Sequence, residues 1–266
     1  MNRIDTTFSS LASANRKALV AFLTAGDPNF DTSLAILRAA CASGVDILEL
    51  GVPFSDPTCD GPVIQLASDR ALKAGMSLSK SIALAAELRK TAATPIVLFS
   101  YYNPLFKYGL ERLARDVAKA GVDGLLVVDL PPEEAGPMNA ALAATGIHLI
   151  RLAAPTSKPE RIRMLADGAG GFLYLISRTG VTGTGGLDYA EVAKHAAAVK
   201  AVCPHPVCIG FGVSSAADMR ALAPLADGVV VGSALVRVIE QAPSSADSPA
   251  LVAAKIRELR GGLDGC

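Results

Sequence analysis

The feature of this sequence that most constrains its fold is an eightfold alternation of short apolar runs with longer amphipathic segments. The runs are rich in Val, Ile and Leu and lie at 19–23, 47–50, 95–99, 124–129, 147–152, 172–176, 207–210 and 228–231. They show no clean polar alternation, which is typical of strands buried on both faces. Repeated strand–helix units predict a parallel sheet covered by helices.

Helical periodicity fills the gaps between these runs. In 31–43, for example, Leu34, Leu37 and Cys41 recur at a spacing of three or four. The other helices of the repeat are predicted at 77–91, 110–120, 133–144, 157–166, 189–202, 216–222 and 234–241. Three segments stand outside the repeat, at 4–13, 62–73 and 250–260.

A closed (β/α)₈ barrel explains this pattern better than a doubly wound open sheet. Eight units complete a barrel, and polar residues follow the C-terminal ends of many different runs, where barrel enzymes build their sites. The 266 residues fall within the roughly 200–400 of one barrel. We therefore predict a single α/β domain over 1–266, a TIM barrel with extra N-terminal and loop helices. The segment 4–13 is a candidate for closing the barrel floor, and 242–249 is a loop by composition.

Charge and cysteine usage exclude several classes of protein. Twenty-five basic residues balance twenty-five acidic ones, which argues against nucleic acid as the main partner. No stretch approaches about 18 uninterrupted apolar residues, so no membrane span is expected. The five cysteines are odd in number and form no C-x-x-C, and no basic-then-apolar leader begins the chain. These features predict free thiols and a cytoplasmic location.

Two carboxylates are candidates for chemistry. Glu49 lies inside the apolar run 47–50, so its side chain either points into a polar cavity or pairs with a Lys or Arg for structure. Its place at the C-terminal end of a barrel strand favours catalysis. Asp60 follows in the next loop, just before a helix that Pro62 is well placed to begin. Taken alone, Asp60 is explained more simply as the cap of that helix.

Glycine-bearing segments follow the sixth, seventh and eighth runs, at 177–186, 210–215 and 232–233. Glycine lets backbone amides approach an anion, and a helix N-terminus adds a favourable dipole. Barrels commonly hold phosphate after strands seven and eight. Tight turns also need glycine, but three such segments together predict a phosphate site. The segment 177–186 suits a lid that closes over substrate, although a connection with no role has the same composition.

Six short motifs run in order between about residues 22 and 240. They are Phe22-Leu-Thr-Ala-Gly-Asp-Pro28, Glu49-Leu-Gly-Val-Pro-Phe-Ser-Asp-Pro57, Asp60-Gly-Pro62, Tyr101-Tyr-Asn-Pro104, Ser177-Arg-Thr-Gly-Val-Thr-Gly183 and Gly210-Phe-Gly212. With their spacing, they make the chain resemble the tryptophan synthase alpha chain family. The resemblance implies a carbon–carbon lyase of tryptophan biosynthesis, which cleaves indole-3-glycerol phosphate to indole and glyceraldehyde 3-phosphate by a retro-aldol reaction.

The resemblance also assigns residues and partners. The family's essential glutamate falls on Glu49 and its essential aspartate on Asp60. Phosphate contacts fall on Gly183, Gly212, Gly232 and Ser233, the indole pocket on Phe22, Phe99, Leu126, Tyr174 and Phe211, and the lid threonine on Thr182. The family implies no metal or cofactor in this chain. It implies an alpha2beta2 assembly, in which indole passes to a beta subunit that holds pyridoxal phosphate.

One departure from the family lies beside the expected aspartate. The family usually has an aliphatic residue and then Ala at this point, where this chain has Thr58 and Cys59. In the family this loop faces the beta subunit, so the change bears on coupling between the subunits more than on chemistry.

The chemistry itself calls for two carboxylates. Indole C3 must be protonated, and the proton of the adjoining glycerol hydroxyl must be removed. One acid–base group such as Glu49 serves both steps if its apolar flanks raise its pKa toward neutrality. Asp60, kept ionised in a more polar loop, would hydrogen-bond the ring N–H and stabilise the positive charge of the protonated ring.

Other functions are compatible with a barrel. A class I aldolase needs a Schiff-base lysine, and no lysine lies in a predicted strand. A metal-dependent aldolase needs gathered histidines, but His148, His195 and His205 are dispersed, and the string from Cys203 to Cys208 around His205 resembles a metal site only superficially. A stand-alone lyase, whose site would look the same, and a structural or regulatory subunit both stay open. Arg151, inside the fifth run, is expected to pair with a carboxylate.

Overall fold

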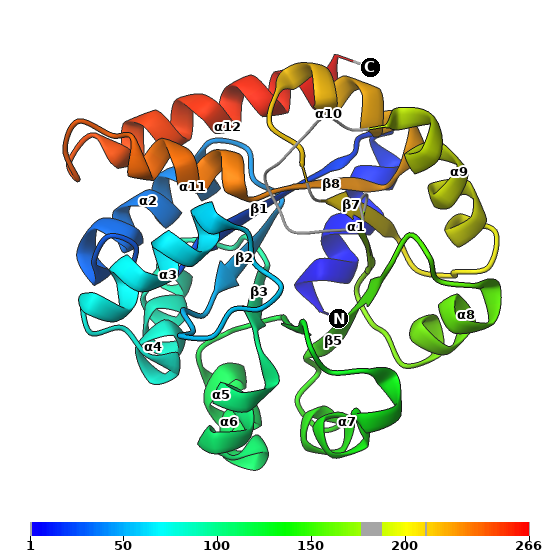
Figure 1. The fold of residues 1–266 in the computed structure, drawn as a ribbon, viewed down its shortest axis with the longest axis horizontal. Coiled ribbons are helices and arrows are strands. Elements are labelled where there is room, and N and C mark those ends of the chain that lie inside the picture. Colours follow the sequence, from blue (N-terminus) through cyan, green and yellow to red (C-terminus); the bar gives the residue numbers. More distant parts are fainter. Residues whose placement is uncertain (1, 177–187, 211, 266) are drawn as a thin grey trace.

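The computed structural model describes residues 2–176, 188–210 and 212–265, and its eight strands close into a parallel barrel (Figure 1). Strand order follows the chain, and β8 pairs with β1. The strands are β1 (Ala18–Thr24), β2 (Ile47–Gly51), β3 (Ile96–Ser100), β4 (Gly124–Val127), β5 (His148–Ala153), β6 (Leu173–Ile176), β7 (Val207–Gly210) and β8 (Gly228–Val231). Each overlaps one predicted run, so the predicted barrel is confirmed and the open-sheet alternative is wrong.

Eight helices of the repeat surround the strands. They are α2 (Phe30–Ala42), α4 (Leu78–Arg89), α6 (Leu110–Lys119), α7 (Gly136–Leu142), α8 (Pro159–Asp167), α9 (Tyr189–Lys200), α10 (Ala216–Leu222) and α11 (Ser233–Glu240). The segments predicted outside the repeat are also helical, as α1 (Arg3–Ser13), α3 (Pro62–Lys73) and α12 (Ser248–Asp264), and α12 packs along α2, α10 and α11 (Figure 1). None of the helices in the described ranges is both long and apolar enough for a membrane span.

One helix, α5 (Tyr102–Tyr108), was not expected, and two short 3₁₀ turns, Pro132–Glu134 and Ala223–Leu225, complete the fold. Pro104 lies within α5. It lies in the first turn of α5, where backbone N–H groups have no partner within the helix and proline is tolerated.

Two apolar layers result from the alternation of side chains along the strands. Outward-facing residues such as Leu19 and Leu48 pack under the surrounding helices. Inward-facing residues fill the barrel interior, and α1 closes this interior from below, as predicted, with Ile4, Phe8 and Leu11. The Phe8 and Phe172 rings lie 5.8 Å apart.

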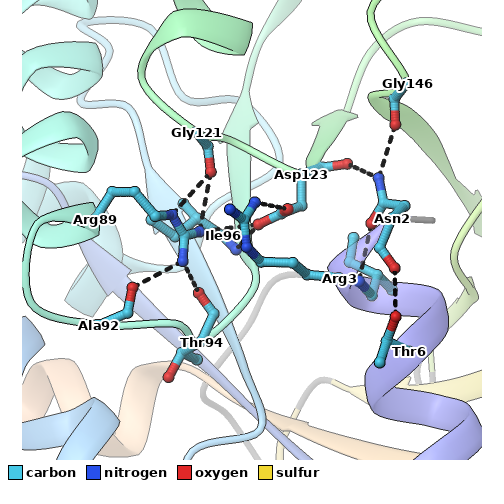
Figure 2. Close-up of polar contacts among 11 residues, drawn as sticks. Asn2, Arg3, Thr6, Arg89, Ala92, Thr94, Ile96, Gly121, Asp123 and Gly146 are labelled. Atoms are coloured by element: carbon cyan, nitrogen blue, oxygen red, sulfur yellow. Dashed lines mark hydrogen bonds and ion pairs between the residues drawn. The ribbon is translucent and has the colours of Figure 1, made fainter.

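Asp123 joins α1 to the barrel floor (Figure 2). Its side chain is 4% exposed and accepts from Arg3 Nη1 at 2.8 Å, Arg89 Nη2 at 2.9 Å and the Ile96 N–H at 2.9 Å. Arg89 also donates to the backbone carbonyls of Ala92, Thr94 and Gly121, while Asn2 Nδ2 donates to the Asp123 and Gly146 carbonyls. One buried carboxylate therefore holds the N-terminal helix and two strands together.

The hydrogen bond from a strand N–H to an aspartate recurs at two other places around the barrel floor. An aspartate precedes each of three even-numbered strands and accepts from the backbone N–H of a residue at the start of the preceding strand. The pairs are Asp46 with Leu19 at 2.8 Å, Asp123 with Ile96 at 2.9 Å and Asp227 with Val207 at 2.9 Å. Each aspartate also meets a cation, which is Arg260, Arg89 or Lys200. These bonds fix the register of neighbouring strands at the floor and leave the opposite end to function.

Candidate active site

Glu49 is buried inside the barrel. Glu49 lies two residues after Ile47 in β2, and residues two apart in a strand point to the same face. Because the Ile47 side chain packs in the barrel interior, the Glu49 side chain also points inward. The side chain is 1% exposed, and among the described residues its Oε1 atom has no hydrogen-bond partner. Removal from water raises the pKa of Glu49 to about 8. No Lys or Arg in the described ranges forms an ion pair with it, so these residues do not support the interpretation as a structural ion pair.

Asp60 lies at the end of the loop that follows β2. The N-cap of α3 is Gly61, without a side-chain cap hydrogen bond, so the interpretation of Asp60 as the cap is wrong. The carboxylate instead accepts a hydrogen bond from the Tyr101 hydroxyl, and the Asp60 carbonyl accepts from Gln65 Nε2 at 2.8 Å. The Tyr101 oxygen accepts from the Cys59 N–H at 3.0 Å.

The surroundings of Asp60 are less polar than its loop suggested. The residue is 9% exposed, and burial raises its pKa to about 6, although the Tyr101 hydrogen bond opposes that rise. Tyr101 is therefore a site residue to which sequence analysis assigned no role. Its only signal was the Tyr101–Pro104 motif at the end of the third run.

Glu49 and Asp60 share one cavity at the C-terminal end of the barrel, with about 460 Å³ of empty space that is partly open to solvent. The lining residues are Phe22, Glu49, Asp60, Ile64, Phe99, Tyr174, Gly212, Val213, Val230, Gly232 and Ser233. Eight of them are predicted site residues. Ile64, Val213 and Val230 were not anticipated, because an isolated aliphatic residue carries no sequence signal of a site.

Four predicted contacts do not appear in this lining. Leu126 is fully buried among the side chains of the barrel interior. Thr182, Gly183 and Phe211 lie outside the described residues, as does the predicted lid at 177–186. All four assignments stay predictions.

Two glycines make room for the aromatic side chains of the cavity. The Phe22 and Phe99 rings meet edge to face, with centroids 5.1 Å apart at 78°. A Cβ on Gly51 would lie 2.5 Å from Cζ of Phe22, and one on Gly210 would overlap the Tyr174 hydroxyl. The close approach of an aromatic ring therefore explains why glycine occupies both positions, whether or not the turns that follow also require glycine.

We expect Gly210→Ala to impair the site through Tyr174. The new methyl group would come within 2.5 Å of the ring carbon that carries the hydroxyl, which forces the buried ring toward the cavity. Overpacking of this kind lowers stability by about 1–3 kcal/mol, and we expect a roughly tenfold higher KM for the indole-bearing substrate that the resemblance predicts. Steady-state kinetics test this, and Tyr174→Phe in the same background should restore part of the loss by removing the overlapping oxygen.

Gly212 and the start of α11, which also line the cavity, suit an anion. Gly212 has φ +84°, a left-handed conformation that favours glycine. Helix α11 begins after Gly232 without a side-chain cap hydrogen bond, so the leading N–H groups at Ser233 and Ala234 are available to a ligand. The helix dipole adds positive potential there, as at other phosphate sites.

The described residues do not supply other catalytic constellations. None of the eight strands contains a lysine, so the geometry of a Schiff-base aldolase is missing from them. No group of three His, Cys, Asp or Glu side chains within the described ranges is arranged to hold a metal ion. Cys208 packs inside the barrel, whereas Cys203 packs in the outer layer.

Arg151 departs from expectation. It is buried in β5, yet no carboxylate of the described residues lies within ion-pair distance, so the predicted ion pair is wrong there. Its Nη1 donates to the Leu130 carbonyl at 3.5 Å, and its Nε has no partner among these residues. Burial lowers the pKa of the guanidinium from its usual value.

Comparison with known proteins agrees with this geometry over almost the whole chain. The family model for the tryptophan synthase alpha chain matches residues 8–263. The tryptophan synthase alpha chains of Desulfosudis oleivorans and Opitutus terrae are 53% and 46% identical, over 98% or more of this chain and 98% of each relative. The crystal structure of tryptophan synthase subunit alpha from Legionella pneumophila superposes with a TM-score of 0.94 at 35% identity, covering 100% of both chains. A tryptophan synthase structure from Mycobacterium tuberculosis gives 0.91 at 37% identity, covering 98% of each chain. The barrel, with a cavity that both Glu49 and Asp60 line, is thus matched along almost its full length, and the chain belongs to the tryptophan synthase alpha chain family.

Proposed function

We propose that Glu49 is the acid–base group and Asp60 the charge-stabilising group in the reaction of this family, the cleavage of indole-3-glycerol phosphate to indole and glyceraldehyde 3-phosphate. The observation that carries the proposal is the buried Glu49 carboxyl, which has no cationic partner in the described part of the chain and lines the same cavity as Asp60 and the uncapped N-terminus of α11. Predicted contacts at Phe22, Phe99 and Tyr174 supply an aromatic wall for the indole ring, while Gly212, Gly232 and Ser233 supply amides for the phosphate.

Two proton transfers at Glu49 complete the reaction. The neutral carboxyl protonates indole C3, and Asp60 accepts a hydrogen bond from the ring N–H and stabilises the resulting positive charge. The Glu49 carboxylate then removes the proton of the adjoining glycerol hydroxyl. The carbon–carbon bond breaks, its electron pair returns to the ring as indole, and the oxygen becomes the aldehyde of glyceraldehyde 3-phosphate. Glu49 ends protonated, ready for the next substrate.

The two raised pKa values predict a bell-shaped dependence of kcat/KM on pH. Asp60 must be ionised, which requires a pH above about 6, and Glu49 must start protonated, which requires a pH below about 8. We expect the flanks of the kcat/KM profile, measured between pH 5 and 9.5, to lie near these values. Asp60→Asn should remove the acidic flank from the residual activity, and an unchanged profile in that variant would rule out the role of Asp60.

The family places the chain in a two-subunit enzyme. The alpha reaction needs no cofactor, and pyridoxal phosphate belongs to the beta subunit. We propose an alpha2beta2 assembly in the cytoplasm, with the loop that contains Thr58 and Cys59 facing the partner. Cys59 is exposed, and its backbone bond to Tyr101 links this loop to the base of α5.

Indole release from indole-3-glycerol phosphate, measured with and without a tryptophan synthase beta subunit, tests the proposal. Slow release alone and a large gain with the beta subunit would support the subunit role. Fast release that the beta subunit leaves unchanged would indicate a stand-alone lyase. No indole under either condition would leave a structural or regulatory barrel.

A further inference from the structure

Three elements that build the wall of the reaction cavity are joined by one ionic cluster. Arg70 on α3 forms a two-point contact with Asp27 in the loop after β1, with Nε to Oδ1 at 2.8 Å and Nη2 to Oδ2 at 2.9 Å. Its remaining terminal nitrogen, Nη1, lies 3.6 Å from Oε1 of Glu240, the last residue of α11. The Asp27 side chain is fully buried, and the other two are about one-third exposed.

The same three elements also meet in an apolar cluster. Phe22 of β1, Ile64 and Ala67 of α3 and Val236 of α11 pack together, and Phe22 and Ile64 line the cavity itself. Residues 64, 67 and 70 follow each other at a spacing of three, so they share one side of α3. The ionic cluster is therefore the outer continuation of the cavity wall.

Neutralising the buried Asp27 carboxylate would by itself account for Arg70 as a stabilising residue. The position of α3 adds a second consequence. This helix begins directly after Asp60 and Gly61, and Gln65 in its first turn holds the Asp60 carbonyl. Helix α11 begins at the anion end of the cavity and finishes at Glu240. Because a helix moves as a stiff unit, the contacts of Arg70 bear on where α3, and with it Asp60, lies relative to α11.

We propose that Arg70 is a positioning residue, which binds Asp27 and Glu240 and thereby fixes Asp60 relative to the phosphate-binding end of α11. The inference rests on the proposed function, since it concerns the placement of Asp60 in that reaction. Without Arg70, α3 loses its polar anchor to both neighbours, and Asp60 can shift and take up water. The amides at the start of α11 keep their place, because α11 is also packed against α12 and β1.

Arg70→Gln in the full chain tests the proposal. We expect kcat for indole release to fall by about ten- to a hundredfold, the scale of a displacement of about 1 Å at a reacting group. The affinity for glycerol 3-phosphate, which probes the anion end alone, should change by less than about twofold. The acidic flank of the kcat/KM profile should move to lower pH, because a hydrated Asp60 ionises more readily. Arg70→Lys keeps the charge but not the two-point contact, so it should restore part of kcat.

Arg3→Gln is the matched control, since it removes another partly exposed arginine from a buried aspartate, at the opposite end of the barrel. It should lower thermal stability and leave the pH profile in place. Glu240→Gln, at a partly exposed residue, provides a second variant if Arg70→Gln does not fold, and we expect a smaller loss of kcat with the same shift of the acidic flank.

Equal loss of stability in Arg70→Gln and Arg3→Gln, with kcat and the acidic flank unchanged in both, would overturn the inference and leave Arg70 a structural residue. A parallel loss of glycerol 3-phosphate affinity would also overturn it, because the whole site would then have moved. If the unmodified chain releases no indole, the proposed function fails first, and this outcome is distinguishable from failure of Arg70 alone.

Discussion

Glu49→Gln should abolish indole formation. The amide has nearly the same shape as the carboxyl but can neither protonate indole C3 nor remove the hydroxyl proton, so both transfers are lost. We expect turnover to fall by about 10³-fold or more, toward the upper end of what positioned acid–base groups contribute. Indole assays at saturating indole-3-glycerol phosphate measure this, with glycerol 3-phosphate binding as the control for an intact phosphate end.

Glu49→Gln should become more stable relative to the unmodified chain as the pH rises. Unfolded, Glu49 ionises near its ordinary pKa of 4.5, whereas in the folded chain its pKa is about 8. Below pH 4.5 both states hold the proton. Between 4.5 and 8 only the unfolded chain releases it, so the folded state loses stability as pH rises, and the full penalty is present above 8. The pKa difference corresponds to roughly 5 kcal/mol at 1.36 kcal/mol per unit.

Urea unfolding at pH 5 and pH 9 measures that difference. Glutamine carries no charge to desolvate, so the stability of Glu49→Gln relative to the unmodified chain should rise by several kcal/mol between the two pH values. Retained indole formation would contradict the acid–base role. A stability difference that stays constant with pH would contradict the raised pKa, whatever the activity.

Asp123→Ala should produce the largest loss of stability among changes at the barrel floor. The variant leaves the largely buried Arg89 without its carboxylate, releases Arg3 of α1 and removes the partner of the buried Ile96 N–H. Removing one partner of a buried ion pair typically costs about 3–5 kcal/mol. Because the network is at the far end of the barrel from the cavity, kcat at permissive temperature should change little.

Urea denaturation midpoints compare Asp123→Ala with Glu87→Gln. The second variant removes an exposed pair with Lys90, for which a change of about 0–1 kcal/mol is expected. Equal midpoints for the two variants would mean that the contacts in Figure 2 contribute no more than a surface pair.

The barrel could be predicted from the sequence because its strands are buried on both faces and its helices carry a continuous apolar side. Boundaries agreed within a few residues, for example 189–202 against Tyr189–Lys200. Helix α5 escaped prediction because Pro104 has two meanings, loop or first turn, and only the surrounding chain decides between them. Arg151 escaped because its environment depends on the β4–β5 packing, where the Leu130 carbonyl takes the place of the expected carboxylate.

The sequence predicted residues of the site only where a recognisable motif contained them. Glu49 and Asp60 came from motifs, but the Tyr101 hydrogen bond to Asp60 joins residues about forty positions apart, and no local pattern announces it. For the same reason Asp60 was expected in polar surroundings, whereas folding buries it. Interactions set by the closure of the barrel are the part that local periodicity cannot supply.

Asp46 has a consequence for anyone who would graft new chemistry onto this scaffold. Its bond to the Leu19 N–H aligns β2 with β1 at the floor, three residues before Glu49. Side chains alternate along a strand, so an offset of a single residue would turn Glu49 away from the cavity and toward the helices. At β2 the position of the Glu49 side chain therefore depends on contacts at the barrel floor. A floor substitution made for stability can turn the Glu49 carboxyl out of the cavity without contacting it.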